Sequence, residues 1–167
     1  MTKIGLISDT HGYLDPSVFK YFDQVDEIWH AGDIGESGVL DQLKAHKTTK
    51  AVFGNIDTPQ YQRDLPEVLI EDINGLKIMM IHIAGKPPRY AKGIKGLLKE
   101  HQPQVLICGH SHILKVERDP AIPLIYINPG AAGQQGFHKK RTIMRFAIEE
   151  GQLKNMEVIQ LGSRGKA

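Results

Sequence analysis

Short apolar runs alternate with amphipathic stretches over the first two thirds of the chain. Runs at 3–7, 27–31 and 49–53 have the length and composition of buried β-strands. The stretches between them carry helix signals. Proline favours the first turn of a helix, so a helix is predicted over Pro16 to Asp23. A second helix is predicted after Ser37, an expected N-cap, because Val39, Leu40 and Leu43 recur at helical spacing.

The rest of the chain is dominated by strands that follow one another directly. Further strands are predicted at 67–71, 77–81, 104–108, 113–117, 124–127, 142–148 and 157–161. Asn74-Gly75 and Glu150-Gly151 lie between such runs and predict hairpin turns. One more helix is expected from Tyr90 to His101, and residues Ser163 to Ala167 are expected to be frayed.

This order of elements predicts the fold class. Helices separate strands early and strands follow strands late, which suits two packed sheets flanked by helices better than one purely parallel sheet. The prediction is a layered α/β or α+β protein. The length of 167 residues fits a single domain spanning 1–167.

Composition and charge remove several classes of function. Apolar residues make up 41% of the chain and charged residues 24%, which excludes intrinsic disorder, collagen and coiled coil. The net charge of +2 is too small for strong nucleic-acid binding. The single cysteine, Cys108, cannot form an intramolecular disulfide. With neither a signal peptide nor a membrane span recognised, a cytoplasmic protein without membrane contact is expected.

Polar side chains follow five of the predicted strands, at the point where each strand ends. Open α/β sheets bind ligands at the carboxyl edge of their strands, so these groups are expected to converge. Each motif alone has a plainer interpretation as a turn or a packed histidine. In succession they predict one metal site, formed by Asp9, His11, Asp33, Asn55, His82, His110 and His112.

The donor chemistry favours two ions over one. Seven nitrogen and oxygen ligands exceed what a single transition ion takes, and two ions need a bridging carboxylate. Imidazole and carboxylate without thiolate suit manganese, iron, zinc or nickel. Glycines at 32, 54 and 109 would let the backbone approach the ions closely.

The series Asp9-x-His11, Gly32-Asp33, Gly54-Asn55, His82 and Gly109-His110-Ser111-His112 resembles the calcineurin-like metallophosphoesterases, specifically their small prokaryotic phosphodiesterase branch. The resemblance implies a four-layer αββα sandwich with two mixed sheets. It also implies two divalent transition-metal ions, manganese first, with nickel, iron or zinc as alternatives. A hydroxide between the ions would attack phosphorus.

The same resemblance implies how the ligands divide between the ions. One ion would be held by Asp9, His11, Asp33 and His112, and the other by Asp33, Asn55, His82 and His110. Asp33, Asn55 and His82 are predicted to be catalytic. The expected partner is a small phosphoester. The oligomeric state is left open, although members of this branch are often dimers or larger.

Two departures from the family pattern concern the substrate rim. Ile56 stands where many members have a histidine that protonates or steers the leaving group. Without that acid, activity is expected to favour aryl or otherwise stabilised leaving groups. After His82 the chain continues Ile83-Ala84-Gly85, where relatives often place glycine directly, so the following loop is expected to reshape the rim.

Several other residues have two interpretations. Asp57 and His30 are interpreted as structural, with a supporting role behind the metal ligands as the alternative. Asn128-Pro129-Gly130 either walls the metal cleft or forms a simple turn. The cluster His138 to Arg141 is interpreted as solvated, with attraction of a phosphate as the alternative.

The leading hypothesis is a dinuclear metal-dependent phosphodiesterase. The alternative is a non-catalytic scaffold or binding protein on the same fold, as in the retromer scaffold subunit, which resembles these enzymes but has an altered metal site. A nuclease is disfavoured by the net charge.

Overall fold

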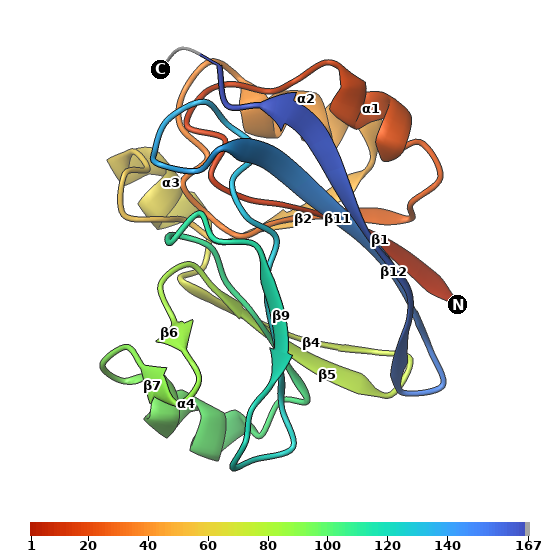
Figure 1. Cartoon of the computed structure of the whole chain (residues 1–167), viewed down its shortest axis with the longest axis vertical. Helices are drawn as coiled ribbons and strands as arrows, with labels where there is room; N and C mark the ends of the chain where they lie inside the picture. The colour runs from red at the N-terminus through yellow and green to blue at the C-terminus, as the bar shows by residue number, and fades with distance from the viewer. Residues whose placement is uncertain (166–167) are drawn as a thin grey trace.

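Two five-stranded β-sheets pack face to face, with helices on their outer faces (Figure 1). This arrangement comes from a computed structural model, which describes residues 1–165. The first sheet has the order β12-β11-β1-β2-β3, with bounds β1 Thr2–Ile7, β2 Glu27–His30, β3 Thr48–Ala51, β11 Lys140–Glu149 and β12 Gln152–Ser163. The second has the order β4-β5-β8-β10-β9, with bounds β4 Val68–Ile73, β5 Leu76–Ile81, β8 Val105–Ile107, β9 Lys115–Arg118 and β10 Ile125–Asn128.

The remaining elements are short. The helices are α1 Ser17–Tyr21, α2 Val39–His46, α3 Pro59–Asp64 and α4 Ile94–His101. A small hairpin joins β6 Gly85–Lys86 to β7 Arg89–Tyr90.

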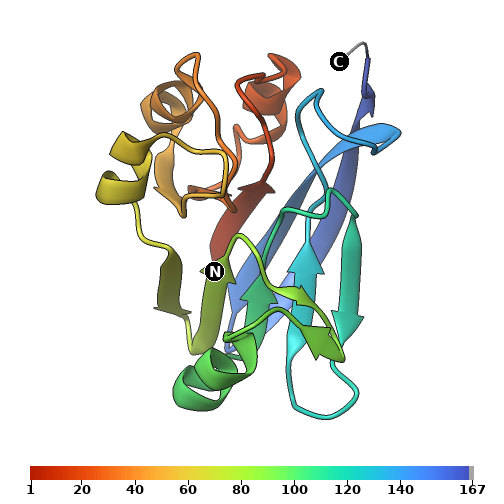
Figure 2. The same ribbon diagram turned by 90° about the vertical axis from the view of Figure 1, so that its left-hand side faces the viewer.

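Each sheet contains three adjacent parallel strands. In the first sheet β1, β2 and β3 run parallel, and β11 and β12 continue it in antiparallel fashion. In the second, β5, β8 and β10 run parallel between the antiparallel edge strands β4 and β9. Parallel strands end at one edge of a sheet, so the loops that follow them gather there. Figures 1 and 2 show that the loops of both sheets meet on the same side of the molecule.

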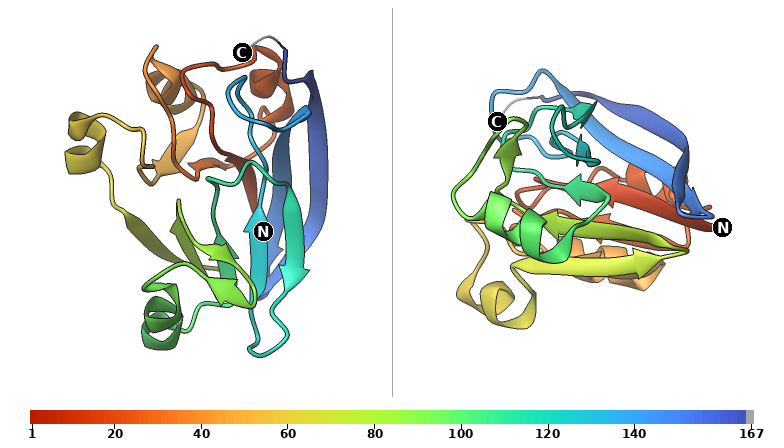
Figure 3. Two further views of the ribbon diagram at one scale, coloured as in Figure 1. Left: turned by 60° about the vertical axis from the view of Figure 1, so that its left-hand side comes forward. Right: turned by 90° about the horizontal axis from the view of Figure 1, so that it is seen from below.

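Alternation along the strands divides the core into layers. On β1, Ile4 and Leu6 point into the space between the sheets, whereas Ile7 packs toward α1 and α2. On β5, Met80 joins the central layer and Met79 packs beneath α4. Figure 3 shows the helices on the two outer sides of the sheets. The predicted four-layer αββα sandwich of two mixed sheets is confirmed.

Hairpins were well predicted, and helix boundaries were not. Asn74 and Gly75 both have positive φ, at 50° and 84°, as the two-residue turn between β4 and β5 requires. The expected N-cap at Ser37 is wrong, since Gly38 occupies that position with φ of 73°. The helix expected from Tyr90 begins only at Ile94, because residues 89–90 pair with β6 instead.

Helix α3 was not predicted. Its signal is short but present: Thr58 Oγ1 accepts a hydrogen bond from Tyr61 N at 3.3 Å, and proline follows in the first turn.

The predicted fraying of the chain end is wrong where the structure describes it. Strand β12 runs to Ser163, and the Arg164 backbone N–H donates to Lys139 O at 3.0 Å. Residues 166 and 167 lie outside the described part. Within residues 1–165, the helices are all too short and too polar to cross a membrane.

Candidate metal centre

The seven predicted ligands lie at the carboxyl ends of parallel strands of both sheets. Asp9 and His11 follow β1, Asp33 follows β2 and Asn55 follows β3. From the second sheet, His82 follows β5, and the loop after β8 carries His110 and His112. The structure gathers six of them into two groups, within each of which the ligand atoms lie within 4.8 Å of one another. The first group is Asp9, His11 and His112, and the second group is Asp33, His82 and His110.

Asp33 stands between the two groups. Its Oδ2 atom lies 3.4 Å from His11 Nε2 in the first group and 3.2 Å from His82 Nε2 in its own. Asp9 Oδ1 lies 3.2 Å from His112 Nε2 and 3.9 Å from His82 Nε2. One carboxylate oxygen thus faces histidines of both groups, which is the position that a bridging ligand requires.

Each carboxylate is held by its other oxygen. Asp9 Oδ2 accepts hydrogen bonds from Ser8 Oγ at 2.7 Å and from the His110 backbone N–H at 3.1 Å. Asp33 Oδ1 accepts from the Ile56 backbone N–H at 3.1 Å. These bonds leave Asp9 Oδ1 and Asp33 Oδ2 directed at the histidines and fix their orientation in advance.

The backbone at the ligands is unusual. Five predicted ligands have the left-handed conformation, with φ between 46° and 71°: Asp9, His11, Asp33, His110 and His112. This region is costly for most residues, although Asp, Asn and His tolerate it better than others. Concentration of this strain at one set of side chains indicates that the surrounding structure holds them for a function.

Glycines let the ligand loops approach one another. A Cβ atom at Gly54 would lie 2.1 Å from Asp33 Oδ1, and one at Gly109 would lie 2.6 Å from Asp9 Oδ2. At Gly32 it would lie 2.6 Å from His82 Nδ1. Real Cβ atoms do not approach so closely, so the predicted close packing of these three glycines is a feature of the structure.

The polar atoms at the centre lack partners. Asp9 Oδ1, His11 Nε2 and His82 Nε2 are buried and make no hydrogen bond. Unpartnered buried polar atoms are costly and rare in folded proteins. Lone pairs of imidazole and carboxylate directed at a shared space fit divalent transition-metal ions, so the residues present suit the group that the sequence predicts.

Without a bound cation, the carboxylates and imidazoles of the centre shift one another's pKa values. Burial opposes ionisation of Asp9, but its interactions with His11 and His112 outweigh burial and hold the pKa of Asp9 well below its usual value. The pKa of His11 is raised, chiefly by Asp9. Burial lowers the pKa of His82, but the carboxylates of Asp33 and Asp9 outweigh it and raise the pKa overall. The centre therefore favours positive charge on its imidazoles, which bound cations would replace.

Asn55 reaches the second group through His110. Its Oδ1 atom lies 3.0 Å from His110 Nδ1, and both residues are exposed. The loop that carries His110 is supported from β10, because the buried Asn128 donates to Gly109 O at 3.0 Å and to Ser111 Oγ at 3.1 Å. The Asn-Pro-Gly segment therefore does more than turn the chain.

Two residues interpreted as structural hold the ligand loops. The fully buried His30 lies 3.0 Å from Thr10 Oγ1, and its Nδ1 accepts from Gly32 N–H at 3.1 Å. Desolvation lowers the pKa of His30 to about 3, so it is neutral. Asp57 accepts from the backbone N–H groups of Gly35 at 2.9 Å and Gly54 at 2.7 Å, and so joins the loops of Asp33 and Asn55.

The solvated interpretation of residues 138–141 is wrong at both ends. His138 is half-buried and packs edge to face on His112, with ring centroids 5.1 Å apart. Arg141 is buried, and its guanidinium lies 2.7 Å from the Asp15 carboxylate. Nothing local in the sequence marked His138, because its partner is brought to it only by the fold.

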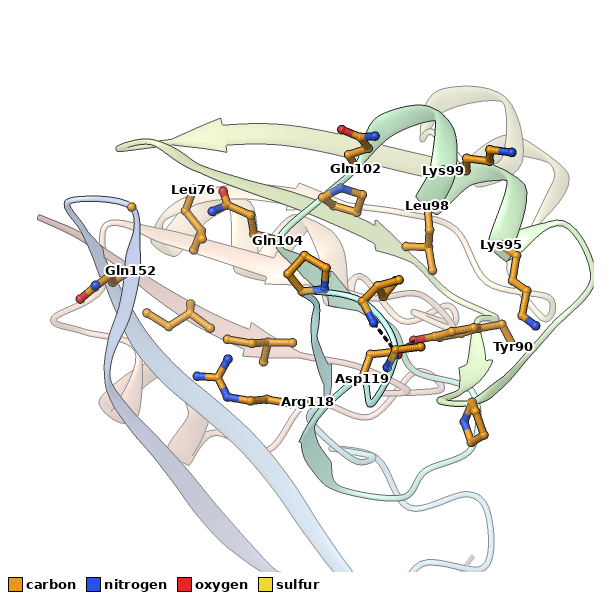
Figure 4. Close-up of a pocket in the computed structure, with 18 residues that line it drawn as sticks. Leu76, Tyr90, Lys95, Leu98, Lys99, Gln102, Gln104, Arg118, Asp119 and Gln152 are labelled. Atoms are coloured by element: carbon orange, nitrogen blue, oxygen red, sulfur yellow. Dashed lines mark hydrogen bonds between the residues drawn. The ribbon is translucent and has the colours of Figure 1, made fainter.

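A separate groove lies away from the predicted ligands. It has a volume of about 1220 Å³ and runs beside α4 and β9 to the turn between β11 and β12 (Figure 4). None of the seven predicted ligands lines it. Tyr90 donates a hydrogen bond to Asp119 across one end of this groove.

Comparison with known proteins agrees with this geometry. Residues 2–151 match the calcineurin-like phosphoesterase superfamily domain. A probable metallophosphoesterase of Methanocaldococcus jannaschii is 36% identical over 153 residues, covering 88% of this chain and 76% of that protein. A probable metallophosphoesterase of Mycoplasma pneumoniae is 32% identical over 138 residues, covering 78% and 79%.

Solved structures share the fold at lower identity. An archaeal phosphodiesterase superposes with a TM-score of 0.75 at 22% identity, covering 96% of this chain and all of that one. Vps29 of Entamoeba histolytica, in a complex with Zn²⁺, superposes with a TM-score of 0.72 at 18% identity, covering 98% and 100%. These likenesses show the fold, whereas the family match and the closer relatives show descent. The chain belongs to the calcineurin-like phosphoesterase superfamily.

Proposed function

We propose that this protein is a dinuclear metal-dependent phosphoester hydrolase that acts on phosphodiesters. The observation that carries the proposal is the position of Asp33 Oδ2, within 3.4 Å of histidine nitrogens from both ligand groups. Two bound divalent ions supply Lewis-acid stabilisation of the charge that develops on an in-line phosphoryl displacement. We place manganese first among the metals, with nickel, iron and zinc as alternatives.

The protein's own contribution is positioning. Asp9 and Asp33 each present one free oxygen while the other is bound to backbone or Ser8, so little reorganisation is needed on loading. His82 donates Nδ1–H to Ala31 O at 2.7 Å, which directs its Nε2 lone pair toward the carboxylates. We assign Asp33 and His82 to the catalytic centre on this basis, and Asn55 because its Oδ1 lies 3.0 Å from His110 Nδ1.

The rim favours ester groups that leave without help from an acid. Ile56, 45% exposed, directly follows Asn55 and can neither donate nor accept a proton. Two other large apolar side chains that directly follow ligands, Ile83 and Ile113, are also exposed. Stabilised aryl leaving groups need least protonation, and apolar side chains suit their rings. We therefore propose a preference for aryl phosphodiesters.

Hydrolysis of bis-nitrophenyl phosphate with and without Mn²⁺ tests the activity, and absence of metal-dependent turnover would refute it. Matched alkyl and nitrophenyl diesters test the leaving-group preference. Comparable rates on the two would contradict the preference while leaving the hydrolase proposal intact.

A second candidate is a non-catalytic scaffold, favoured by the structural likeness to Vps29. Metal content after purification, compared with that of an Asp33→Ala variant, separates the two candidates. Two ions lost together with activity in the variant support the hydrolase, whereas a wild-type protein that holds no metal and hydrolyses nothing supports the scaffold.

A further inference from the structure

His138 lies directly behind one of the predicted ligands. The loop of residues 129–139, between β10 and β11, brings its ring against His112 with an interplanar angle of 79°. The Nε2 atom of His112 faces Asp9 Oδ1 at 3.2 Å, so this nitrogen points into the centre. The other ring nitrogen, Nδ1, points toward the loop, where a Cβ atom at Gly136 would lie 2.2 Å from it.

Hydrogen bonding fixes the tautomer of His138. Its Nε2 lies 2.8 Å from Gly133 O, and a carbonyl oxygen can only accept, so Nε2 carries the hydrogen. The Nδ1 atom of the neutral ring is then an acceptor. It is buried and has no hydrogen-bond partner among the described residues.

Both Nδ1 atoms lie close to Gly136. A Cβ atom at Gly136 would lie 2.2 Å from His112 Nδ1 and 3.2 Å from His138 Nδ1, so the absence of a side chain at Gly136 lets both rings pack against its backbone. A histidine that binds a metal through Nε2 carries its hydrogen on Nδ1 and almost always donates it to an acceptor. His82 already does so, toward Ala31 O.

The loop itself is tied down on two sides. The Gly133 N–H donates to Asp9 O at 3.1 Å, which links the loop to the first ligand group. From the other side, the Arg164 guanidinium donates to Gly136 O, and the Arg164 N–H donates to Lys139 O. His138 is therefore held in place rather than displayed on a free surface.

We propose that His138 is a positioning residue for His112. Its Nδ1 accepts the His112 Nδ1–H, directly or through one water, and so holds His112 Nε2 toward the first ligand group. This inference rests on the metal centre of the proposed function.

Two near-isosteric variants separate positioning from loop support. The His138→Asn variant keeps a hydrogen-bond acceptor at the position of Nδ1 and loses the hydrogen bond to Gly133 O. The His138→Gln variant keeps a donor at the position of Nε2 and loses the acceptor at the position of Nδ1. The measurement is Co²⁺ binding to the metal-free protein, followed by visible absorption and calorimetry. His101→Gln on α4, away from the centre, is the control.

We expect His138→Gln to weaken binding of one of the two Co²⁺ ions about 10–100-fold, and His138→Asn to bind nearly as the wild type does. A role limited to supporting the loop predicts the reverse order. Normal binding of two ions by His138→Gln, or a larger defect in His138→Asn, would overturn the inference alone. A wild-type chain that binds no Co²⁺ would overturn the metal centre and the inference together.

Discussion

The two ligand groups differ in how deeply the fold encloses them. In the first group Asp9 is fully buried, and the side chains of His11 and His112 are 13% exposed. In the second group the side chains of Asp33 and His82 are each 3% exposed. The third member, His110, is exposed and lies beside the exposed Asn55. Buried, preorganised ligands lose less freedom on binding than exposed ones. We therefore expect the first group to hold its ion more tightly and the second to exchange its ion more easily.

The largest effect is expected where the two groups meet. Asp33→Asn removes the negative charge that faces both groups, so it should weaken both ions and lower hydrolysis of bis-nitrophenyl phosphate by at least about 10²–10³-fold. Metal analysis and steady-state rates measure this. Asp72→Asn, an exposed change on β4, is the control. Retention of two ions at the wild-type rate would mean that Asp33 is not a shared ligand.

Removal of one histidine from each group tests the asymmetry directly. His110→Ala should leave one ion bound after desalting, whereas His112→Ala should leave less, because the group that remains intact is the more exposed one. Calorimetry should find that the site remaining in His110→Ala binds its ion at least about 10-fold more tightly than the site remaining in His112→Ala. Changes around metal ligands typically alter affinity on this scale. Equal affinities in the two variants would show that burial does not rank the groups.

Glycine substitutions test how tightly the centre is packed. Gly54→Ala would place Cβ 2.1 Å from Asp33 Oδ1 and should cost about 1–3 kcal/mol of unfolding free energy, together with metal affinity. Gly96→Ala, on α4 with open space around it, should instead stabilise by about 0.5–1 kcal/mol. Chemical denaturation measures both. A small loss of unfolding free energy in Gly54→Ala would mean that the loop of Gly54 can move away from Asp33.

The smallest expected effect is a dependence on pH. In the metal-free protein the pKa values of His11 and His82 are raised above 6.5, and metal needs both imidazoles neutral. Apparent Co²⁺ affinity should therefore fall as pH drops below the raised values, by about tenfold per pH unit for each proton displaced.

The stability of the chelator-treated protein should change in the opposite direction. A raised folded pKa stabilises fully below the unfolded value and less as pH rises through the folded value. The contribution of His11 and His82 to unfolding free energy is thus fully present below pH 6.5 and is lost as pH rises through their raised folded pKa values. Thermal melts in chelator above pH 6.5, where His30 is neutral in both the folded and the unfolded state, check the sign, and a rise in stability with pH there would contradict these pairings.

Sequence patterns located the strands well, because strands depend on local spacing, and the predicted ligands lie at strand ends as the patterns indicated. Short apolar runs marked β1 and β5, and each predicted ligand follows such a run. Element ends were less predictable: Gly38 replaced Ser37 as the helix cap, and residues 89–90 formed a hairpin because β6 lies beside them.

Supporting roles were harder to predict for a different reason: such a role was only the alternative interpretation for His30 and Asp57, and none was expected for His138. His30, Asp57 and His138 act through contacts between segments that are distant in sequence, such as His30 with Thr10 and His138 with His112. Spacing carries no record of such contacts. Candidate ligands can be recognised from residue type at a strand end. The residues that support them can be recognised only from contacts between loops in the folded structure.

Each ligand group draws on both sheets: Asp9 and His11 come from the first and His112 from the second, while Asp33 comes from the first and His82 and His110 from the second. A cation bound by either group would therefore cross-link the two sheets of the sandwich. Its binding energy would add to the cohesion of the core. Metal supply during synthesis would then influence the stability of the folded protein.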